Sequence, residues 1–264
     1  MRLIDTHSHL FLEEFSEDLP QVIERARSAG VTHIFMPNID STTIDSMLSV
    51  CNTYNDYCFP MIGLHPTSVN ADYEKELELV ARELRSFNKY IAIGEVGMDL
   101  YWDKTFLKEQ QIVLDKQINW ALEYDLPVVI HCRDAFGYIY NVLEPYKNTS
   151  LKGVFHSFTG TDDEAARILE FSGFLIGING VVTFKKSRLP EVLTKIPLEK
   201  IVLETDSPYL TPVPNRGKRN ESAYVKDTLM KVSDIYRMSP EAVGRVTLLL
   251  CSTLHFLQFL EKCL

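Results

Sequence analysis

Two histidines one residue apart, His7 and His9, follow the first apolar run of this chain. If residues 3–7 form a β-strand, side chains alternate between its two faces, so both imidazoles can point to the same side. Two imidazoles that converge from a strand end are suited to bind a metal ion. The pair alone is a weak sign, because His-x-His also occurs where histidines only pack or form hydrogen bonds.

Later apolar runs in the chain also end in a histidine or an acid. The residues in these positions are Glu95, His131, His156 and Asp206. Imidazole and carboxylate groups are ordinary ligands of divalent metal ions. A single histidine at a strand end usually serves packing, but six such residues at one rim predict a metal site.

Segments typical of strands and of helices alternate along the sequence. The expected strands are residues 3–7, 32–36, 59–64, 90–93, 127–130, 153–155, 174–178 and 201–203. The expected helices are 16–30, 41–53, 72–87, 104–124, 134–146, 162–171 and 189–195, followed by a mostly helical tail over 222–263. Nearly continuous apolar strands predict a parallel sheet covered by helices.

Eight strand–helix repeats in 264 residues favour one architecture. We expect an α/β fold, a single (β/α)8 TIM barrel with a C-terminal helical tail, rather than an open doubly wound sheet. No linker divides the sequence, so residues 1–264 are expected to form one domain. Functional residues of such barrels lie at the carboxyl ends of the strands, which is where all six candidate ligands fall.

The candidate ligand set is larger than one ion needs, because a catalytic Zn²⁺ takes three ligands from protein. The expected arrangement is a bridging Glu95, with His7, His9 and Asp206 at one ion and His131 and His156 at the other. Two divalent ions roughly 3.5–4 Å apart form a clamp for displacement at phosphorus and also activate water. No cysteine is needed, which favours Mg²⁺, Mn²⁺ or Zn²⁺.

Further residues near these strand ends could contact substrate or orient ligands. His65 ends the third expected strand, and we expect it to contact phosphate, with loop packing as the alternative. Arg133 lies two residues after His131 and could hold a phosphate oxygen, with a salt bridge at the rim equally open. Glu204 alternates to the same side as Asp206 and is a candidate to orient a ligand.

Two other groups of side chains have open interpretations. The basic residues Arg216, Lys218 and Arg219 follow Asp206, where they either form a solvated loop or grip a polyanion. Four aromatic residues near the mouth either pack the rim or stack on unpaired bases, and these are Tyr101, Trp102, Phe158 and Tyr209.

Composition limits the partners and the location. Hydrophobic content of 45% and charged content of 24% are typical of soluble globular proteins. A net charge of −9 argues against a protein surface coated with positive charge for nucleic acid, but bound cations would offset the charge of an acidic site.

Five scattered cysteines and the lack of a signal-peptide pattern predict reduced thiols in a cytoplasmic protein. The apolar stretch 246–260 is too short and mixed to span a bilayer. No membrane and no obligate protein partner is expected.

Six motifs together resemble those of the TatD family of metal-dependent deoxyribonucleases, which are amidohydrolase-like barrels. The motifs are IDTHSHL (4–10), GLHP (63–66), GEVGMD (94–99), VIHCRDA (129–135), HSFTG (156–160) and LETDSPYL (203–210). They occur in order and at similar spacing, and the likeness covers about residues 2–245. The resemblance implies that the six candidate ligands bind the metals and that His65 approaches substrate phosphate.

The resemblance also implies hydrolysis of DNA phosphodiester bonds, often from a 3′ end. We therefore expect a hydrolase acting on ester bonds, a two-metal deoxyribonuclease that degrades single-stranded DNA, with RNA also open, in the 3′–5′ direction. Asp206 would bind metal and accept the proton of the attacking water, and Glu95 would bridge the ions. The alternative is an amidohydrolase acting on a small cyclic amide or ester. It is disfavoured because Glu95 stands where many such enzymes carry a carbamylated lysine. An inactive scaffold is disfavoured by the intact ligand set.

Two departures from the family pattern affect the expected packing. The loop at 219–222 reads Arg-Asn-Glu-Ser where the family commonly has Arg-Asn-Glu-Pro, and losing the proline should make it less rigid. In the tail, Leu250 replaces an asparagine and Leu254-His255 replaces a leucine–phenylalanine pair. These changes weaken expectations about tail packing but leave the metal site unaffected.

Overall fold

Eight parallel strands form the centre of the molecule. The computed structural model describes residues 1–87 and 89–253. The strands are β1 (Leu3–Asp5), β2 (Val31–Pro37), β3 (Cys58–Met61), β4 (Ile93–Asp99), β5 (Val128–Arg133), β6 (Gly153–Phe155), β7 (Phe174–Ile178) and β8 (Ile201–Leu203). They are hydrogen-bonded in sequence order, β1 to β3 in one sheet and β4 to β8 in another. This order and the parallel pairing confirm the predicted α/β fold.

Hydrogen bonds join the two sheets into a ring. At the seam between β3 and β4, the Ile62 N–H donates to the Ala92 carbonyl at 3.1 Å. At the seam between β8 and β1, the Thr6 N–H donates to the Leu203 carbonyl, also at 3.1 Å. The strands therefore enclose a barrel, and the carboxyl ends of all eight face one mouth.

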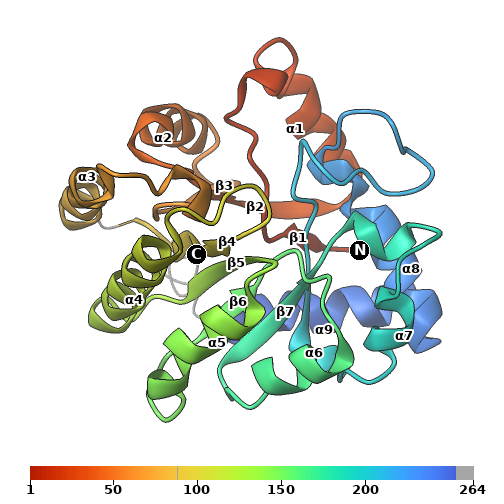
Figure 1. Cartoon of the computed structure of the whole chain (residues 1–264). Helices are drawn as coiled ribbons and strands as arrows, with labels where there is room; N and C mark the ends of the chain where they lie inside the picture. Colours follow the sequence, from red (N-terminus) through yellow and green to blue (C-terminus); the bar gives the residue numbers. More distant parts are fainter. Residues whose placement is uncertain (88, 254–264) are drawn as a thin grey trace.

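Helices lie around the outside of the strands (Figure 1). They are α1 (Leu19–Ser28), α2 (Ile44–Thr53), α3 (Tyr73–Ser86), α4 (Leu107–Glu123), α5 (Phe136–Leu143), α6 (Asp162–Ile168), α7 (Leu189–Leu193), α8 (Val225–Tyr236) and α9 (Pro240–Thr253). Short 3₁₀ helices lie in the loops, at Glu13–Phe15, Ser41–Thr43, Pro66–Ser68, Glu144–Tyr146, Gly180–Thr183, Leu198–Lys200 and Ser222–Tyr224. Apolar residues recur on one face of each long helix, as Val113, Leu114 and Ile118 do in α4, and that face is buried.

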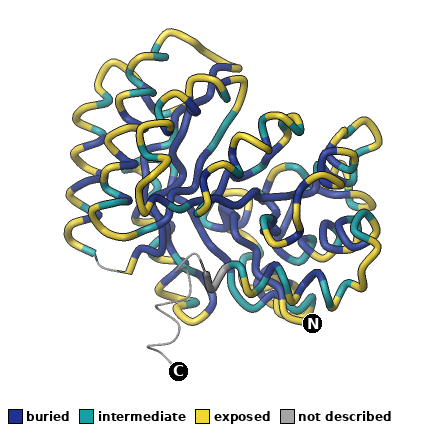
Figure 2. The backbone as a smooth tube through the Cα atoms, turned by 90° about the horizontal axis from the view of Figure 1, so that it is seen from below, coloured by how far each residue is buried: buried dark blue, intermediate teal, exposed yellow. Residues whose placement is uncertain are grey.

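Two apolar cores hold the barrel rigid. The larger fills the layer between strands and helices. The smaller lies inside the ring and contains residues of the strands together with two that precede β4, namely Ile4, Phe35, Met61, Ile91, Ala92, Val129, Val154, Leu175 and Val202. Figure 2 shows the same division, with buried strands in the interior and exposed outer surfaces on the helices. A barrel filled by side chains is a packed scaffold, so function is confined to its mouth.

The structure corrects two strand ends that the sequence placed too early. Residues 90–93 and 127–130 were expected as strands, but β4 runs to Asp99 and β5 to Arg133. Gly97 pairs with His131, and a Cβ on Gly97 would lie 2.0 Å from the His131 carbonyl oxygen. A glycine is therefore required inside the strand, although glycines in sequence usually indicate a turn.

The tail agrees with its predicted helical character as far as it is described. Helix α9 packs against α8, β1 and β8, and Leu248 and Leu250 contact the inner core. The expected Leu254-His255 pair lies outside the described residues. None of the described helices has the length and apolar character needed to cross a membrane. Cysteines 51, 58 and 132 are free thiols, while the side chains of the other two fall outside the described part.

Candidate metal centre

Glu95 lies at the centre of a cluster formed at the strand ends, and its carboxylate is buried. Its Oε2 is 3.1 Å from His7 Nε2 and 3.7 Å from His9 Nε2. Its Oε1 is 2.8 Å from His131 Nδ1 and 3.0 Å from His156 Nε2. His65 Nε2 is 3.3 Å from the same Oε1, so the two oxygens of one carboxylate face two different groups of imidazoles.

Asp206 completes the first of these groups. Its Oδ1 lies 3.6 Å from His9 Nε2 and 3.8 Å from His7 Nε2. Its backbone has a φ of 58°, in the left-handed region that non-glycine residues seldom adopt, and its N–H donates to the His7 carbonyl. Such conformations persist where surrounding contacts fix them, often at functional sites. The six residues expected as ligands therefore come together at one place.

His156 lies between the two expected ion positions. Its ring stacks on that of His7, with centroids 3.7 Å apart. His7, His156 and Asp206 each offer a ligand atom within 4.8 Å of the others. His156 is therefore placed to serve either position, whereas the sequence assigned it to the ion of His131.

The donor set fits a divalent cation. The buried Nε2 atoms of His7 and His9 are 3.2 Å apart and face the carboxylates of Glu95 and Asp206. Tetrahedral ligands of Zn²⁺, at about 2.0–2.1 Å from the ion, lie about 3.4 Å from one another. Buried charges in proteins are paired or coordinate metals. The spacing and chemistry of these four groups match ligands around a cation.

Charge interactions keep the central carboxylate ionised. Burial alone would raise the pKa of Glu95, but His156, His65 and His7 hold it well below its ordinary value. Burial also opposes the charged form of His156, yet Glu95 and Glu204 raise the pKa of His156 well above its ordinary value. The cluster is thus a compact set of opposite charges in a desolvated place.

Asp99 is a functional candidate that sequence reasoning missed. Its Oδ2 lies 3.0 Å from His131 Nε2, while the other ring nitrogen faces Glu95. Burial would lower the pKa of His131, but its hydrogen bonds to Asp99 and Glu95 raise it. A carboxylate behind an imidazole fixes its orientation. The signal was alternation, because Glu95, Gly97 and Asp99 occupy every second position of β4.

Glu204 has the position expected of an orienting acid. Its Oε1 lies 3.4 Å from His156 Nδ1 and accepts a hydrogen bond from the Ser157 N–H at 2.5 Å. The side chain is fully buried. It therefore supports His156 from the side opposite Glu95, as Asp99 supports His131.

His65 lies at the edge of the cluster. Its Nδ1 faces Thr67, whose Oγ1 is 2.6 Å away and whose N–H is 3.2 Å away, so Nε2 is the ring nitrogen that faces the cluster. This Nε2 lies 3.3 Å from Glu95 Oε1. Burial and neighbouring histidines lower the pKa of His65 against the opposing effect of Glu95. His65, Glu95 and His131 also offer ligand atoms within 4.8 Å of one another, so His65 faces the same space as the six expected ligands.

Arg133 lies at the rim and is exposed. Its Cζ is 3.9 Å from the centroid of the Tyr101 ring and 5.3 Å from that of Trp102. No ion pair joins it to any described carboxylate. The rim salt bridge considered from the sequence is therefore absent from the described residues, and the guanidinium instead lies against aromatic rings.

The loop after Asp206 is tied to the barrel by its polar residues. Arg219 forms a bidentate ion pair with Asp18, in which its two terminal nitrogens each lie 2.8 Å from one carboxylate oxygen. The Asn220 amide donates to the carbonyls of Thr205 and Tyr209. These contacts anchor the loop without the proline common in the family, and they leave Arg219 engaged with an acid.

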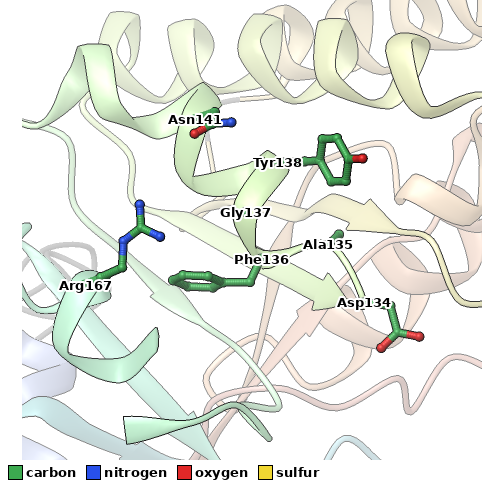
Figure 3. Close-up of a pocket in the computed structure, with 7 residues that line it drawn as sticks. All are labelled: Asp134, Ala135, Phe136, Gly137, Tyr138, Asn141 and Arg167. Atoms are coloured by element: carbon green, nitrogen blue, oxygen red, sulfur yellow. The ribbon is translucent and has the colours of Figure 1, made fainter. Parts of the chain in front are cut away.

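A separate shallow pocket of about 360 Å³ lies at the start of α5, beside α6. In Figure 3, the Phe136 ring and the Arg167 side chain approach each other across it, and Arg167 Cζ is 5.7 Å from the ring centroid. None of the six expected ligands lines this pocket. Among the described residues, the candidate metal ligands gather at the barrel mouth rather than in this pocket.

Comparison with known proteins places this fold and cluster among metal-dependent hydrolases. A family described as TatD related DNase matches residues 4–254. An uncharacterized metal-dependent hydrolase, YabD, of Bacillus subtilis is 37% identical over 246 residues, covering 93% of this chain and 95% of its own. A protein of Pantoea ananatis named 3′-5′ ssDNA/RNA exonuclease TatD is 32% identical over 249 residues, covering 92% and 95%.

A comparison with solved structures also finds a TatD homologue. The TatD homologue YJJV of Escherichia coli has a TM-score of 0.89 at 29% identity and covers 96% of this chain and 97% of its own. The fold, the cluster of candidate ligand residues and the relatives define a metal-dependent hydrolase of the barrel type. The chain belongs to the TatD family.

Proposed function

We propose that this protein is a two-metal phosphodiesterase that removes nucleotides from the 3′ ends of single-stranded DNA or RNA. The observation that supports it most is the position of Glu95, whose two carboxylate oxygens face separate groups of imidazoles. A bridging carboxylate suits paired ions, which are typical of phosphodiester displacement. The 3′–5′ direction rests on the names of two relatives, from Pantoea ananatis and Erwinia billingiae.

Six residues would hold the ions, and they are His7, His9, Glu95, His131, His156 and Asp206. Bound divalent ions would activate water and offset the charge that develops at the phosphate. Asp206 is ionised, because His9 and the other histidines lower its pKa against the effect of burial. Its carboxylate can therefore accept a proton from the attacking water.

Two residues at the edge of the cluster would hold the phosphate. His65 presents its Nε2 toward the cluster, and Arg133 presents a cation at the rim. Both can donate to non-bridging oxygens. Water then adds to phosphorus as the bond to the 3′ oxygen breaks. One proton of the water passes to Asp206, and solvent supplies the proton that the leaving oxygen takes up.

A time course on single-stranded DNA labelled at its 5′ end tests this function. Chelated enzyme should be inactive, and adding back Mg²⁺, Mn²⁺ or Zn²⁺ should yield products that shorten steadily from the 3′ end. His9→Ala should lose this activity. The matched control is His33→Ala, since His33 lies on β2 outside the cluster.

A second substrate panel separates the amidohydrolase alternative. Hydrolysis of bis(p-nitrophenyl) phosphate, with no action on cyclic amides, agrees with the proposal. Turnover of an amide by enzyme that leaves DNA intact would refute it.

A further inference from the structure

Two neighbouring aromatic side chains beside the metal cluster are exposed. Trp102 is 73% exposed, more than any other large hydrophobic side chain that the structure describes, and Tyr101 is 53% exposed. Their ring centroids are 4.8 Å apart and the rings are nearly perpendicular. Large aromatic rings are normally buried, and exposed ones mark surfaces that bind.

The guanidinium of Arg133 lies near both rings. Its Cζ is 3.9 Å from the centroid of Tyr101 and 5.3 Å from that of Trp102. Among the described residues, its guanidinium has neither an ion pair nor a side-chain hydrogen bond. A cation held by aromatic faces keeps its N–H edge available to an anion.

These three residues are tied directly to the cluster. The Tyr101 N–H donates to Asp99 Oδ1 at 3.0 Å, and Asp99 Oδ2 contacts His131 Nε2. The Leu100 N–H donates to the Arg133 carbonyl, which continues the pairing of β4 with β5. The Asp99 carboxylate thus contacts both a candidate metal ligand, His131, and the backbone of Tyr101. It therefore fixes the position of the aromatic pair relative to the cluster.

We propose that Trp102, Tyr101 and Arg133 form a stacking platform for an unpaired nucleobase next to the phosphate that is cut. Trp102 stacks on the base, while Tyr101 holds Arg133 in place to balance phosphate charge. The net charge of −9 repels a polyanion, so stacking supplies affinity that overall charge does not. This inference rests on the proposed function and names the side chains that would hold the unpaired base next to the scissile phosphate.

Kinetics on two strands test the platform. The substrates are single-stranded DNA and the same strand with a base-free tetrahydrofuran residue at its 3′ end. Trp102→Ala should raise KM for the normal strand by about 5- to 150-fold, with a smaller effect on kcat. Wild type should lose a similar factor on the base-free strand, whereas Trp102→Ala should treat both strands alike.

The matched control is Tyr124→Ala. Tyr124 is 39% exposed and follows the far end of α4, away from the mouth. This variant should behave as wild type. An unchanged KM in Trp102→Ala would overturn the platform. It would also be overturned if the base-free strand lowered the efficiency of Trp102→Ala by the same factor as that of wild type.

Fluorescence separates this inference from the proposed function. The chain has two tryptophans, Trp102 and Trp120, and the second is partly buried in the core. With EDTA present, an oligothymidylate should quench wild type and Trp120→Phe but not Trp102→Phe. Metal-loaded wild type that fails to cut DNA refutes the function alone, while absent quenching in wild type refutes the platform.

Discussion

Asp99 holds His131 from behind, with Asp99 Oδ2 at 3.0 Å from His131 Nε2 while the other ring nitrogen faces Glu95. Asp99→Asn keeps the size of the side chain but removes the charge that orients the imidazole. We expect the affinity for Mn²⁺ to fall by about 10- to 100-fold, as measured by competition with a chelating dye. Asp103→Asn, at an exposed position in the same loop, serves as control. Equal affinities in both variants would argue against an orienting role.

Glu95 should determine how many ions bind. Protein loaded with Mn²⁺ should approach about two ions per chain, because the carboxylate faces two groups of imidazoles. Glu95→Gln should lose at least one of them, and Glu144→Gln, in an exposed 3₁₀ helix, should lose none. The measurement is elemental analysis after gel filtration. A plateau at one ion in fully active wild type would mean that Glu95 is no bridge.

Asp206 can act as a ligand, as a proton acceptor or as both, and Asp206→Asn separates these roles. The amide keeps one coordinating oxygen but lacks the basicity. If Asp206 accepts the proton, a deficit of roughly 100- to 10,000-fold in kcat should persist at saturating Mn²⁺. Recovery to nearly the wild-type rate with excess metal would leave it as a ligand only. Glu204 would then be the first candidate for the base.

Arg25 should stabilise the loop that follows the site. It forms a two-nitrogen ion pair with Glu221, whose side chain is only 6% exposed. Arg25→Met leaves that carboxylate without its cation, and we expect the free energy of unfolding to fall by about 1–3 kcal/mol. Arg85→Met, whose partner Glu78 is exposed, should change it by less than about 1 kcal/mol. Urea titration measures both, and equal effects would contradict the assignment.

Asp18 should make part of the stability depend on pH. Its hydrogen bonds from Arg219 and Arg25 hold its pKa below its ordinary value against the effect of burial. The ionised Asp18 carboxylate therefore contributes fully to the free energy of unfolding above the ordinary aspartate pKa of about 4. This contribution is lost as pH falls through the lowered pKa. The difference in Tm between wild type and Asp18→Asn should shrink as pH falls. A constant difference down to pH 3 would show that the carboxylate charge contributes nothing.

Much of the fold followed from the sequence because apolar periodicity reports burial directly. Strands β6, β7 and β8 were predicted with the observed bounds, since each is a short buried run between turns. Strand β4 was misplaced because Gly94 and Gly97 resemble turn residues until the neighbouring backbone of β5 is present. Local patterns cannot show how close another strand approaches.

The site was predictable in its main members and in one supporting acid, Glu204, but not in the other, Asp99. The histidines and acids at strand ends could be found because barrel topology brings every strand end to one mouth. The orienting role of Asp99 could not be assigned from spacing alone, since it depends on which ring nitrogen of His131 the carboxylate contacts. The stacking of Arg133 on Tyr101 likewise depends on side-chain directions that sequence does not state. The ligand roles, the single domain and the cytoplasmic location stay predictions.

The seam between the first and last strands has a consequence for biosynthesis. His7 and Asp206 become neighbours through contacts such as that of Asp5 with Thr205, which are 200 positions apart in sequence. A growing chain on the ribosome therefore has its first imidazoles exposed long before the last carboxylate emerges. The full set of candidate metal ligands can assemble only after β8 has docked, so a metal site that uses all of them would form only once nearly the whole polypeptide has been made.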